Sequence, residues 1–215
     1  MYVVFCLLMG YAAGALNPSY IIARIKGFDI RGSGSGNAGG SNALITMGKG
    51  IGAFCILFDI GKAYGVVKLA CLVFPEGRLA FAAASVGAVY GHIFPPYMRF
   101  KGGKGLACLG GAILAFDPIV FLIMLGCEFI ILFATNYICF VPLTASAAFP
   151  VVYGVMTGDI AGALVLVLIT AVIVYKHVEN LRRIRKGTEM RFSYLWNKDA
   201  ERDRIVENSR EGSSD

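Results

Sequence analysis

Long apolar stretches, separated by short polar or turn-forming stretches, fill the chain from its first residues to about residue 176. A helix needs roughly 20 apolar residues to cross the hydrocarbon layer of a membrane. The stretches that approach this length are 2–24, 51–74, 78–96, 105–117, 118–135, 138–156 and 159–176. The pattern therefore predicts an all-α, polytopic membrane helix bundle with about seven transmembrane helices. Because the fourth stretch is short, five or six crossings also stay open.

The positions of Lys and Arg predict how this bundle is oriented, because these residues collect in cytoplasmic loops. If the N-terminus lies outside, the inner loops receive the basic residues of 24–49 and 99–104 and the whole basic run from Lys176 onward. Only Arg78 then falls clearly on the outer side. The charge pattern thus predicts an odd number of spans and a cytoplasmic C-terminus.

The composition supports a membrane protein and argues against other classes. Hydrophobic residues make up 57% of the 215 residues and charged residues 16%, which is unusual for a soluble domain. The net charge is +6, but most of the Lys and Arg residues lie outside the apolar stretches and are not interleaved, on a soluble domain, with aromatic residues that could stack on bases. No nucleic acid partner is therefore expected. The six cysteines lie in or beside apolar segments without metal-ligand spacing, so neither a metal nor a cofactor is expected.

The chain is expected to divide into a membrane domain, residues 1–190, and a charged cytoplasmic tail, residues 191–215, that is partly disordered, with the disorder expected at its last residues, 208–215. Within the tail, the aromatic stretch 191–198 could lie at the membrane interface or be solvated. The pattern leaves both readings open.

The first polar segment of note is residues 29–50, which is rich in glycine, serine and asparagine. Alternating glycines allow successive backbone N–H groups to turn toward one point and bind an anion. Ser35, Asn37, Ser41 and Asn42 would add donors, and the second span, which follows directly, would add a helix N-terminus. The alternative is a flexible linker.

The second polar segment, residues 91–105, reads GHIFPPYMRFKGGKG. Its prolines end a span, and Lys101 and Lys104 then lie in a loop where Gly102 and Gly103 permit close approach of a phosphate. The spacing differs from that of a Walker phosphate loop. A plain cytoplasmic turn is the alternative, and His92 is expected to be a structural histidine at a helix end.

The third polar segment is residues 177–189, at the end of the last span. His177 and Asn180 are three residues apart and should share a helix face. The basic residues that follow should point elsewhere: Arg182, Arg183, Arg185 and Lys186. An ordinary basic helix end is the alternative. Within the second span, Asp59 and Lys62 have the same spacing, and we expect them to neutralise each other and fix the bundle.

The sequence contains no recognisable nucleophile motif: it has no GxSxG elbow and no HxxxxD acyltransferase signature. If the protein is an enzyme, the reactive group should therefore arrive with a substrate.

Taken in order, the three segments resemble the membrane acyl-phosphate:glycerol-3-phosphate acyltransferase family of bacteria. Its patterns GSGNxGxTN, GHxFPxxxxFKGGKG and HxxNIxRxxxGxE correspond here to Gly34–Asn42, Gly91–Gly105 and His177–Glu189. The DIGK of the second span also fits the family's DxxKG, with Ala63 in place of the glycine. The resemblance covers nearly the whole chain before the tail.

This resemblance implies that residues 1–190 form an acyltransferase-like domain in the inner (plasma) membrane of a bacterium, with the active site facing the cytoplasm. The implied substrates are acyl phosphate and glycerol 3-phosphate, and the products are lysophosphatidic acid and phosphate, formed without an acyl-enzyme. Membrane lipids surround the protein, and a monomer is expected to suffice. A substrate phosphate or His177 would take the proton of the attacking hydroxyl.

Residue roles carry over from the family by position. The implied catalytic residues are Lys104, His177 and Asn180. The implied substrate-binding residues are Ser35, Asn37, Ser41, Asn42, Lys101, Gly102 and Gly103.

The chain also departs from the family pattern. Ile45 replaces an arginine, Ser41 and Cys108 replace threonines, and Cys139 and Pro142 interrupt a serine-containing run. Each lost charged hydrogen bond should weaken anion binding by about 1.5–3 kcal/mol. Two other functions therefore stay open: a transporter of phosphate or of a phosphorylated metabolite, and a divergent inactive paralogue.

Overall fold

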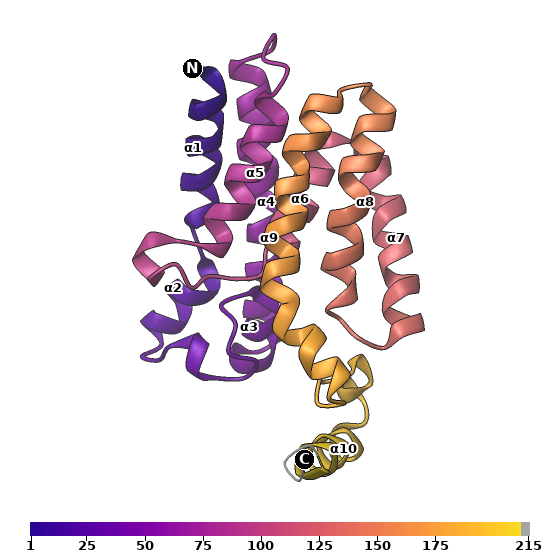
Figure 1. Ribbon diagram of the computed structural model, residues 1–215. Helices are drawn as coiled ribbons and strands as arrows, with labels where there is room; N and C mark the ends of the chain where they lie inside the picture. The colour runs from indigo at the N-terminus through magenta and orange to yellow at the C-terminus, as the bar shows by residue number, and fades with distance from the viewer. Residues whose placement is uncertain (212–215) are drawn as a thin grey trace.

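The computed structural model describes residues 1–211, and over this range it is helical, without β-strands. Figure 1 shows long helices side by side, with the short helices α2 and α3 at the end of the bundle opposite the N-terminus. The α-helices are α1 (Tyr2–Ala15), α2 (Pro18–Ile25), α3 (Gly40–Met47), α4 (Lys49–Val73), α5 (Ala80–Ile93), α6 (Leu106–Phe116), α7 (Pro118–Thr135), α8 (Phe140–Thr157), α9 (Ile160–Arg185) and α10 (Lys198–Glu211). Three short 3₁₀ helices are η1 (Ile30–Gly32), η2 (Pro96–Met98) and η3 (Phe192–Leu195).

The predicted all-α class is confirmed for the described residues. Four segments are long and apolar enough to cross a membrane: Tyr2–Ile25, Pro118–Thr135, Phe140–Thr157 and Ile160–Arg185. The other predicted spans correspond to α4, which carries four charged side chains, and to α5 and α6, which have 14 and 11 residues. Seven crossings and the orientation of the termini therefore stay predictions.

The first predicted span is not one helix, because it breaks before Pro18. Proline has no N–H to donate, and the break leaves backbone carbonyls without helical partners. The Tyr97 hydroxyl donates to the carbonyl of Ala15 at 2.8 Å, and the Lys62 ammonium donates to the carbonyl of Leu16. Side chains from other elements therefore hold this break in place.

Helices α1 and α5 pack in close contact through glycines spaced four residues apart. These are Gly10 and Gly14 on α1 and Gly87 and Gly91 on α5. A Cβ atom at any of the four would lie 2.1–2.3 Å from a backbone oxygen of the other helix. Small residues with this spacing let membrane helices approach closely. The Tyr11 hydroxyl of α1 also donates to the carbonyl of Phe94 at 2.5 Å, so α1 contacts the start of the loop that follows α5.

A hydrogen bond links α9 to α8 at the position where α8 contains an internal proline. Pro150 cannot donate to the carbonyl of Ser146, one turn earlier in the helix. The hydroxyl of Thr170 on α9 donates to this carbonyl instead, at 2.5 Å. Such replacement partners make a proline tolerable within a membrane helix.

Two boundaries differ from the sequence prediction. The glycine-rich segment does not run directly into the second span, because α3 forms within it and Gly48, with φ of +91°, separates α3 from α4. The last span was predicted to end at 176, but α9 continues to Arg185. His177 and Asn180 are therefore part of a long, continuous helix.

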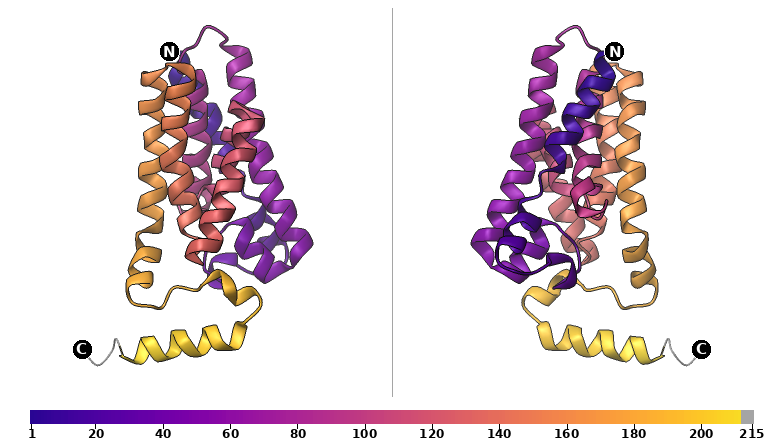
Figure 2. Two further views of the ribbon diagram at one scale, coloured as in Figure 1. Left: turned by 90° about the vertical axis from the view of Figure 1, so that its right-hand side faces the viewer. Right: turned by 90° about the vertical axis from the view of Figure 1, so that its left-hand side faces the viewer.

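The tail contains η3 and α10, and α10 lies crosswise beyond the end of α9 (Figure 2). Its helix includes residues 208–211, where disorder was expected. The rest of that expectation, residues 212–215, lies outside the described residues.

Candidate active site

The glycine-rich segment is folded around the side chain of Asn42, which is only 1% exposed. Its amide nitrogen donates to the carbonyls of Ile30, Ser33 and Asn37 at 2.9–3.0 Å. Its amide oxygen accepts from the backbone N–H of Ser35 at 2.8 Å. A segment tied together in this way is not a flexible linker, so that alternative is wrong. Because both ends of the Asn42 amide are used within the loop, its role in this geometry is to shape the loop.

Other predicted donors of this segment remain accessible. Ser35 and Ser41 are exposed, and Asn37 is half-buried beside Gly39, the residue that precedes α3. The N-terminus that follows the loop is therefore that of α3, and Ser41 lies in its first turn. Ile45, at the position of the family's arginine, is one turn further along α3 and 60% exposed.

Arg31 and Asn17 connect the first polar segment to the rest of the fold. The Arg31 guanidinium donates to the carbonyl of Met98, in the second segment, at 2.7 Å. It also pairs with Asp29 at 2.7 Å, and this hydrogen-bonded pair lowers the pKa of the Asp29 carboxyl to about 2. The Asn17 amide, at the break between α1 and α2, donates to the carbonyl of Ala38 at 2.8 Å. Neither Arg31 nor Asn17 was identified from the sequence as a site residue.

In the second segment, Gly102 and Gly103 are required for packing against His92. A Cβ atom on Gly102 would lie 2.1 Å from the His92 carbonyl oxygen, and one on Gly103 would lie 2.0 Å from its Nε2. Their N–H groups donate to the carbonyls of Ile93 and His92 at 2.9 and 3.1 Å. The absence of side chains at these glycines therefore makes room for His92 and the end of α5. From the sequence alone, this room was instead expected to serve a phosphate. Lys101, in the same loop, is exposed.

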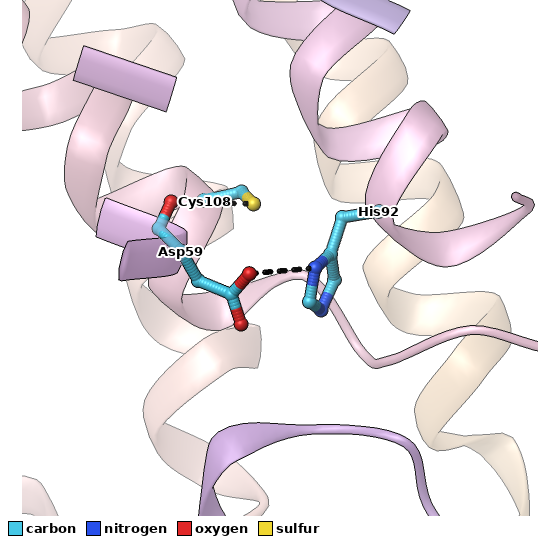
Figure 3. A group of neighbouring side chains, drawn as sticks. All are labelled: Asp59, His92 and Cys108. Carbon is cyan, nitrogen blue, oxygen red and sulfur yellow. Dashed lines mark hydrogen bonds and ion pairs between the residues drawn. The ribbon is translucent and has the colours of Figure 1, made fainter. Parts of the chain in front are cut away.

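His92 belongs to a buried cluster with Asp59, Lys62 and Cys108, part of which is drawn in Figure 3. The Lys62 ammonium lies 2.6 Å from Asp59 Oδ1 and 3.2 Å from His92 Nδ1. The expected pairing of Asp59 with Lys62 is thus confirmed, and buried His92 also lies against this carboxylate, with its Nδ1 3.4 Å from Asp59 Oδ1 (Figure 3). Carboxylate, imidazole and thiol are metal-ligand types, but the lysine already places a positive charge at the carboxylate. This donor set therefore fits an internal ion pair better than a metal.

The third segment meets the second through Lys104. Its ammonium donates to Asn180 Oδ1 at 2.7 Å, and Asn180 Nδ2 donates to Glu189 Oε1 at 2.6 Å. Arg183 Nε donates to the other oxygen of Glu189, also at 2.6 Å. The prediction that Arg183 points away from this face is wrong, because the turn at Gly187 brings Glu189 back along the helix. Burial lowers the pKa of Lys104, although the charge of Glu189 opposes this effect.

His177 is buried on the same face of α9 as Asn180, as the spacing predicted. Its Nδ1 lies 2.8 Å from the carbonyl oxygen of Ile173, one turn earlier. A carbonyl only accepts hydrogen bonds, so Nδ1 carries the hydrogen, and Nε2 of the neutral ring is left as an acceptor. This tautomer suits a group that accepts a hydrogen bond from a substrate hydroxyl.

The remaining departures from the family pattern are buried near these elements. Cys108, on α6, lies with its sulfur 3.6 Å from the carbonyl oxygen of Asp59. Cys139 and Pro142 lie at the start of α8, where the missing N–H of a proline costs little because first-turn N–H groups have no helical partner. The three residues that replace hydroxyl-bearing residues of the family, Cys108, Cys139 and Pro142, are thus all buried.

Taken together, the contacts unite the three polar segments. Arg31 and Met98 join the first segment to the second, and Lys104 and Asn180 join the second to the third. Helices α2 and α3 and the last turns of α9 all lie at the end of the bundle opposite the N-terminus (Figures 1 and 2). Which side of a membrane this end faces stays a prediction.

The chain matches the family model described as glycerol-3-phosphate acyltransferase over residues 4–187. A relative of that name from Clostridioides difficile (strain 630) is 37% identical over 186 residues, which cover 84% of this chain and 91% of the relative. One from Methylorubrum populi is 39% identical, over 86% of this chain and 90% of the relative.

A solved structure with the same architecture is that of PlsY (YgiH), an integral membrane glycerol 3-phosphate acyltransferase, in its glycerol 3-phosphate form. It superposes with a TM-score of 0.82 at 29% identity and covers 90% of this chain and 96% of its own. The lysophosphatidic acid form gives a TM-score of 0.80 at 28% identity. The chain therefore belongs to the glycerol-3-phosphate acyltransferase family, and it is an integral membrane acyltransferase of phospholipid biosynthesis.

Proposed function

We propose that the protein transfers the acyl group of an acyl phosphate to the 1-hydroxyl of glycerol 3-phosphate, without an acyl-enzyme. The products are lysophosphatidic acid and phosphate. The observation that carries this proposal is the contact between Lys104 and Asn180, which brings a cation of the second segment to the buried face of α9 that also carries His177. The names of the relatives and the substrate and product forms of PlsY support the choice of acceptor.

The proposed step needs no nucleophile from the protein. The oxygen of the 1-hydroxyl attacks the acyl carbon and forms the ester bond, while the bond from that carbon to the phosphate oxygen breaks. The electron pair of the broken bond stays on the phosphate, which also receives the hydroxyl proton in the net reaction. Because an acyl phosphate is a mixed anhydride and already activated, the protein has only to orient the reactants and stabilise their charge.

We assign the reacting end of the site to Lys104, His177 and Asn180. The Lys104 ammonium stabilises the charge that grows on the leaving phosphate. His177 Nε2 accepts a hydrogen bond from the attacking hydroxyl, since Nδ1 is committed to the Ile173 carbonyl. Asn180 holds Lys104 through its oxygen and, like His177, faces the buried side of α9.

The phosphate of glycerol 3-phosphate is assigned to the first segment. Ser35, Asn37 and Ser41 lie at the N-terminal end of α3, where side-chain donors and the helix dipole both favour an anion. Asn42 keeps this loop in shape, and Gly102 and Gly103 keep the second loop against His92. Lys101, which is exposed, adds a positive charge that attracts anionic substrates.

For the membrane arrangement we propose seven crossings in a bacterial inner membrane, with the N-terminus outside and the three polar segments at the cytoplasmic side. Glycerol 3-phosphate is soluble and would enter from the cytoplasm, while the acyl chain stays among the helices. The excess of Lys and Arg in the segments assigned to the inside supports this orientation. A monomer contains all the groups named above.

The test uses purified protein in detergent with acyl phosphate and glycerol 3-phosphate, and it measures phosphate release. Release should require both substrates and should be matched by formation of lysophosphatidic acid. Labelled acyl phosphate without acceptor should leave no label on the denatured protein, whereas retained label would contradict the direct transfer. Uptake of glycerol 3-phosphate into proteoliposomes without acyl transfer would contradict the proposed reaction.

A further inference from the structure

The C-terminal segment that follows the family-matched region contacts the turn after α9. The matched region ends at residue 187, and α10 begins at Lys198. From α10, Arg204 donates to the carbonyl of Gly187 through Nη1 and to the carbonyl of Glu189 through Nη2, the latter at 2.7 Å. The Asn208 amide also donates to the Gly187 carbonyl, at 2.8 Å. Two side chains of α10 therefore hold the main chain of this turn.

The guanidinium of Arg204 is itself held in a defined orientation. Glu201 accepts from its Nε at 3.0 Å and from its Nη2 at 2.5 Å. Glu201 is buried and also accepts from the backbone N–H of Arg191 at 2.8 Å. A planar guanidinium with several donors can use one edge for a carboxylate and the others for carbonyl groups, which a lysine cannot do.

The turn that Arg204 holds carries Glu189, the last link to the reacting groups. The Glu189 carboxylate accepts from Asn180 and Arg183, each at 2.6 Å. Asn180 in turn accepts from the Lys104 ammonium at 2.7 Å. A continuous series of hydrogen bonds thus leads from α10 to the cation of the proposed active site.

We propose that Arg204 is a positioning residue for acyl transfer: by fixing the main chain of Gly187–Glu189, it sets the position of Glu189, and thereby of Asn180 and Lys104. This inference rests on the proposed function, because it assigns the C-terminal segment to that same site. Arg204 acts through Glu189 and is not assigned any contact with a substrate. In this proposal, the C-terminal segment therefore helps to position the residues of the active site.

A second anchor keeps this segment in place independently of Arg204. The N–H of Phe192 donates to the Asn136 carbonyl at 2.7 Å, and the N–H of Ser193 donates to Asn136 Oδ1 at 2.9 Å. The rings of Phe192 and Phe133 also meet, with centroids 5.7 Å apart. A substitution of Arg204 should therefore loosen the turn at Glu189 without releasing the segment from α7.

The test compares Arg204→Met and Arg204→Lys in the full-length protein in detergent, with acyl phosphate and glycerol 3-phosphate as substrates. Arg204→Met should raise the KM for acyl phosphate, whose phosphate is assigned to Lys104, at least fivefold, with a smaller change in the KM for glycerol 3-phosphate and an unchanged thermal unfolding midpoint. Arg204→Lys should recover part of the loss, because a lysine reaches the carbonyls but cannot hold both in the same way. The matched control is Arg182→Met, since the Arg182 side chain is exposed and pairs only with exposed Glu179 among the described residues.

The pH dependence of KM provides a readout that a merely structural role would not move. Lys104 faces the charge of Glu189, which favours its protonated form, and the charges of Arg183 and Lys176, which oppose it. Two further titratable groups act on the same site: the Cys139 thiol, which favours the protonated form when ionised, and the His177 ring. If Arg204→Met displaces Glu189, the KM should begin to rise at a lower pH than in the wild type. Glu201→Gln, which removes a charged partner of Arg204, should shift the KM in the same direction by a smaller factor.

Wild-type values of KM and of its pH profile in Arg204→Met would overturn the proposal. So would a loss of activity that simply follows a lowered unfolding midpoint. The proposed function is tested separately, by the activity of the wild type and its loss in Lys104→Ala. An inactive wild type would therefore refute that function. An active wild type whose KM and pH profile are unchanged by Arg204→Met would refute this inference alone.

Discussion

Lys104 donates a 2.7 Å hydrogen bond to Asn180 across 76 residues of sequence, and through it the loop after α5 meets the end of α9. The ammonium is half-buried, and its partner is held from the other side by Glu189. A lysine fixed in this way provides a localised positive charge where two anionic substrates could meet. Its orientation comes from α9, which also carries His177.

Removal of this ammonium should abolish most of the activity. Lys104→Ala is expected to lower phosphate release at least tenfold, because the positive charge next to the leaving phosphate is lost. Lys101→Ala is the matched control: this lysine lies in the same loop but is exposed, so we expect less than a threefold change. Equal effects of the two substitutions in the phosphate-release assay would remove Lys104 from the proposed site.

The affinity for acyl phosphate should depend on pH through Lys104. Burial lowers the pKa of this lysine below its ordinary value of 10.5, and only the protonated form attracts the anion. As the pH rises through this lowered pKa, the charge is lost and KM should increase. Lys104→Arg stays charged, so its KM should lack this alkaline rise. Steady-state kinetics from pH 7 to pH 10 in the two proteins make the comparison.

The buried pair of Asp59 and Lys62 should matter for stability more than for catalysis. Asp59→Asn alone leaves the Lys62 charge unpaired in the bundle, at a cost of about 3–5 kcal/mol, whereas Lys62→Met should cost less because His92 Nδ1 still lies 3.4 Å from Asp59 Oδ1. The double variant removes both charges and should recover part of this loss, but not all, because the Leu16 carbonyl still lacks its donor. Thermal unfolding in detergent measures these differences. A double variant that is no more stable than either single one would argue against the pair.

Restoring the family's cation at position 45 should improve substrate binding. Ile45 is exposed on α3, one turn beyond Ser41, so an arginine can be placed there without disturbing the core. One new charged hydrogen bond is worth about 1.5–3 kcal/mol, so the KM for glycerol 3-phosphate should fall roughly tenfold or more in Ile45→Arg. Ile45→Gln controls for polarity without charge. If the arginine leaves KM unchanged, the phosphate does not bind at this end of α3.

Much of the helical framework could be predicted because it depends on local patterns. The apolar stretches correspond to helices, and Asp117 with Pro118, like Thr157 to Asp159, marks a turn between neighbouring helices. Pairings within one helix were also predictable, as for Asp59 with Lys62, because a spacing of three residues places both side chains on one face. The break at Pro18 was missed, although its proline is a local signal, because the apolar pattern continues across it.

For the candidate site, the sequence indicated polar residues of interest but not the contacts that they make in the fold. Asn42 turns inward to the loop's own carbonyls, and Gly103 makes room for His92 instead of a phosphate. Glu189 joins Asn180 only because the chain reverses at Gly187.

Hydropathy, glycine content and helical spacing are properties of neighbouring residues, so the amino-acid order alone is enough for the all-helical class, for the main helical stretches and for the three polar segments. Buried polar groups are almost always hydrogen-bonded. Which atoms form these bonds depends on which segments, distant in sequence, pack against each other. The contacts of Lys104 with Asn180 and of Arg31 with Met98 belong to this second kind. Only the packed bundle therefore decides that the three segments contact one another.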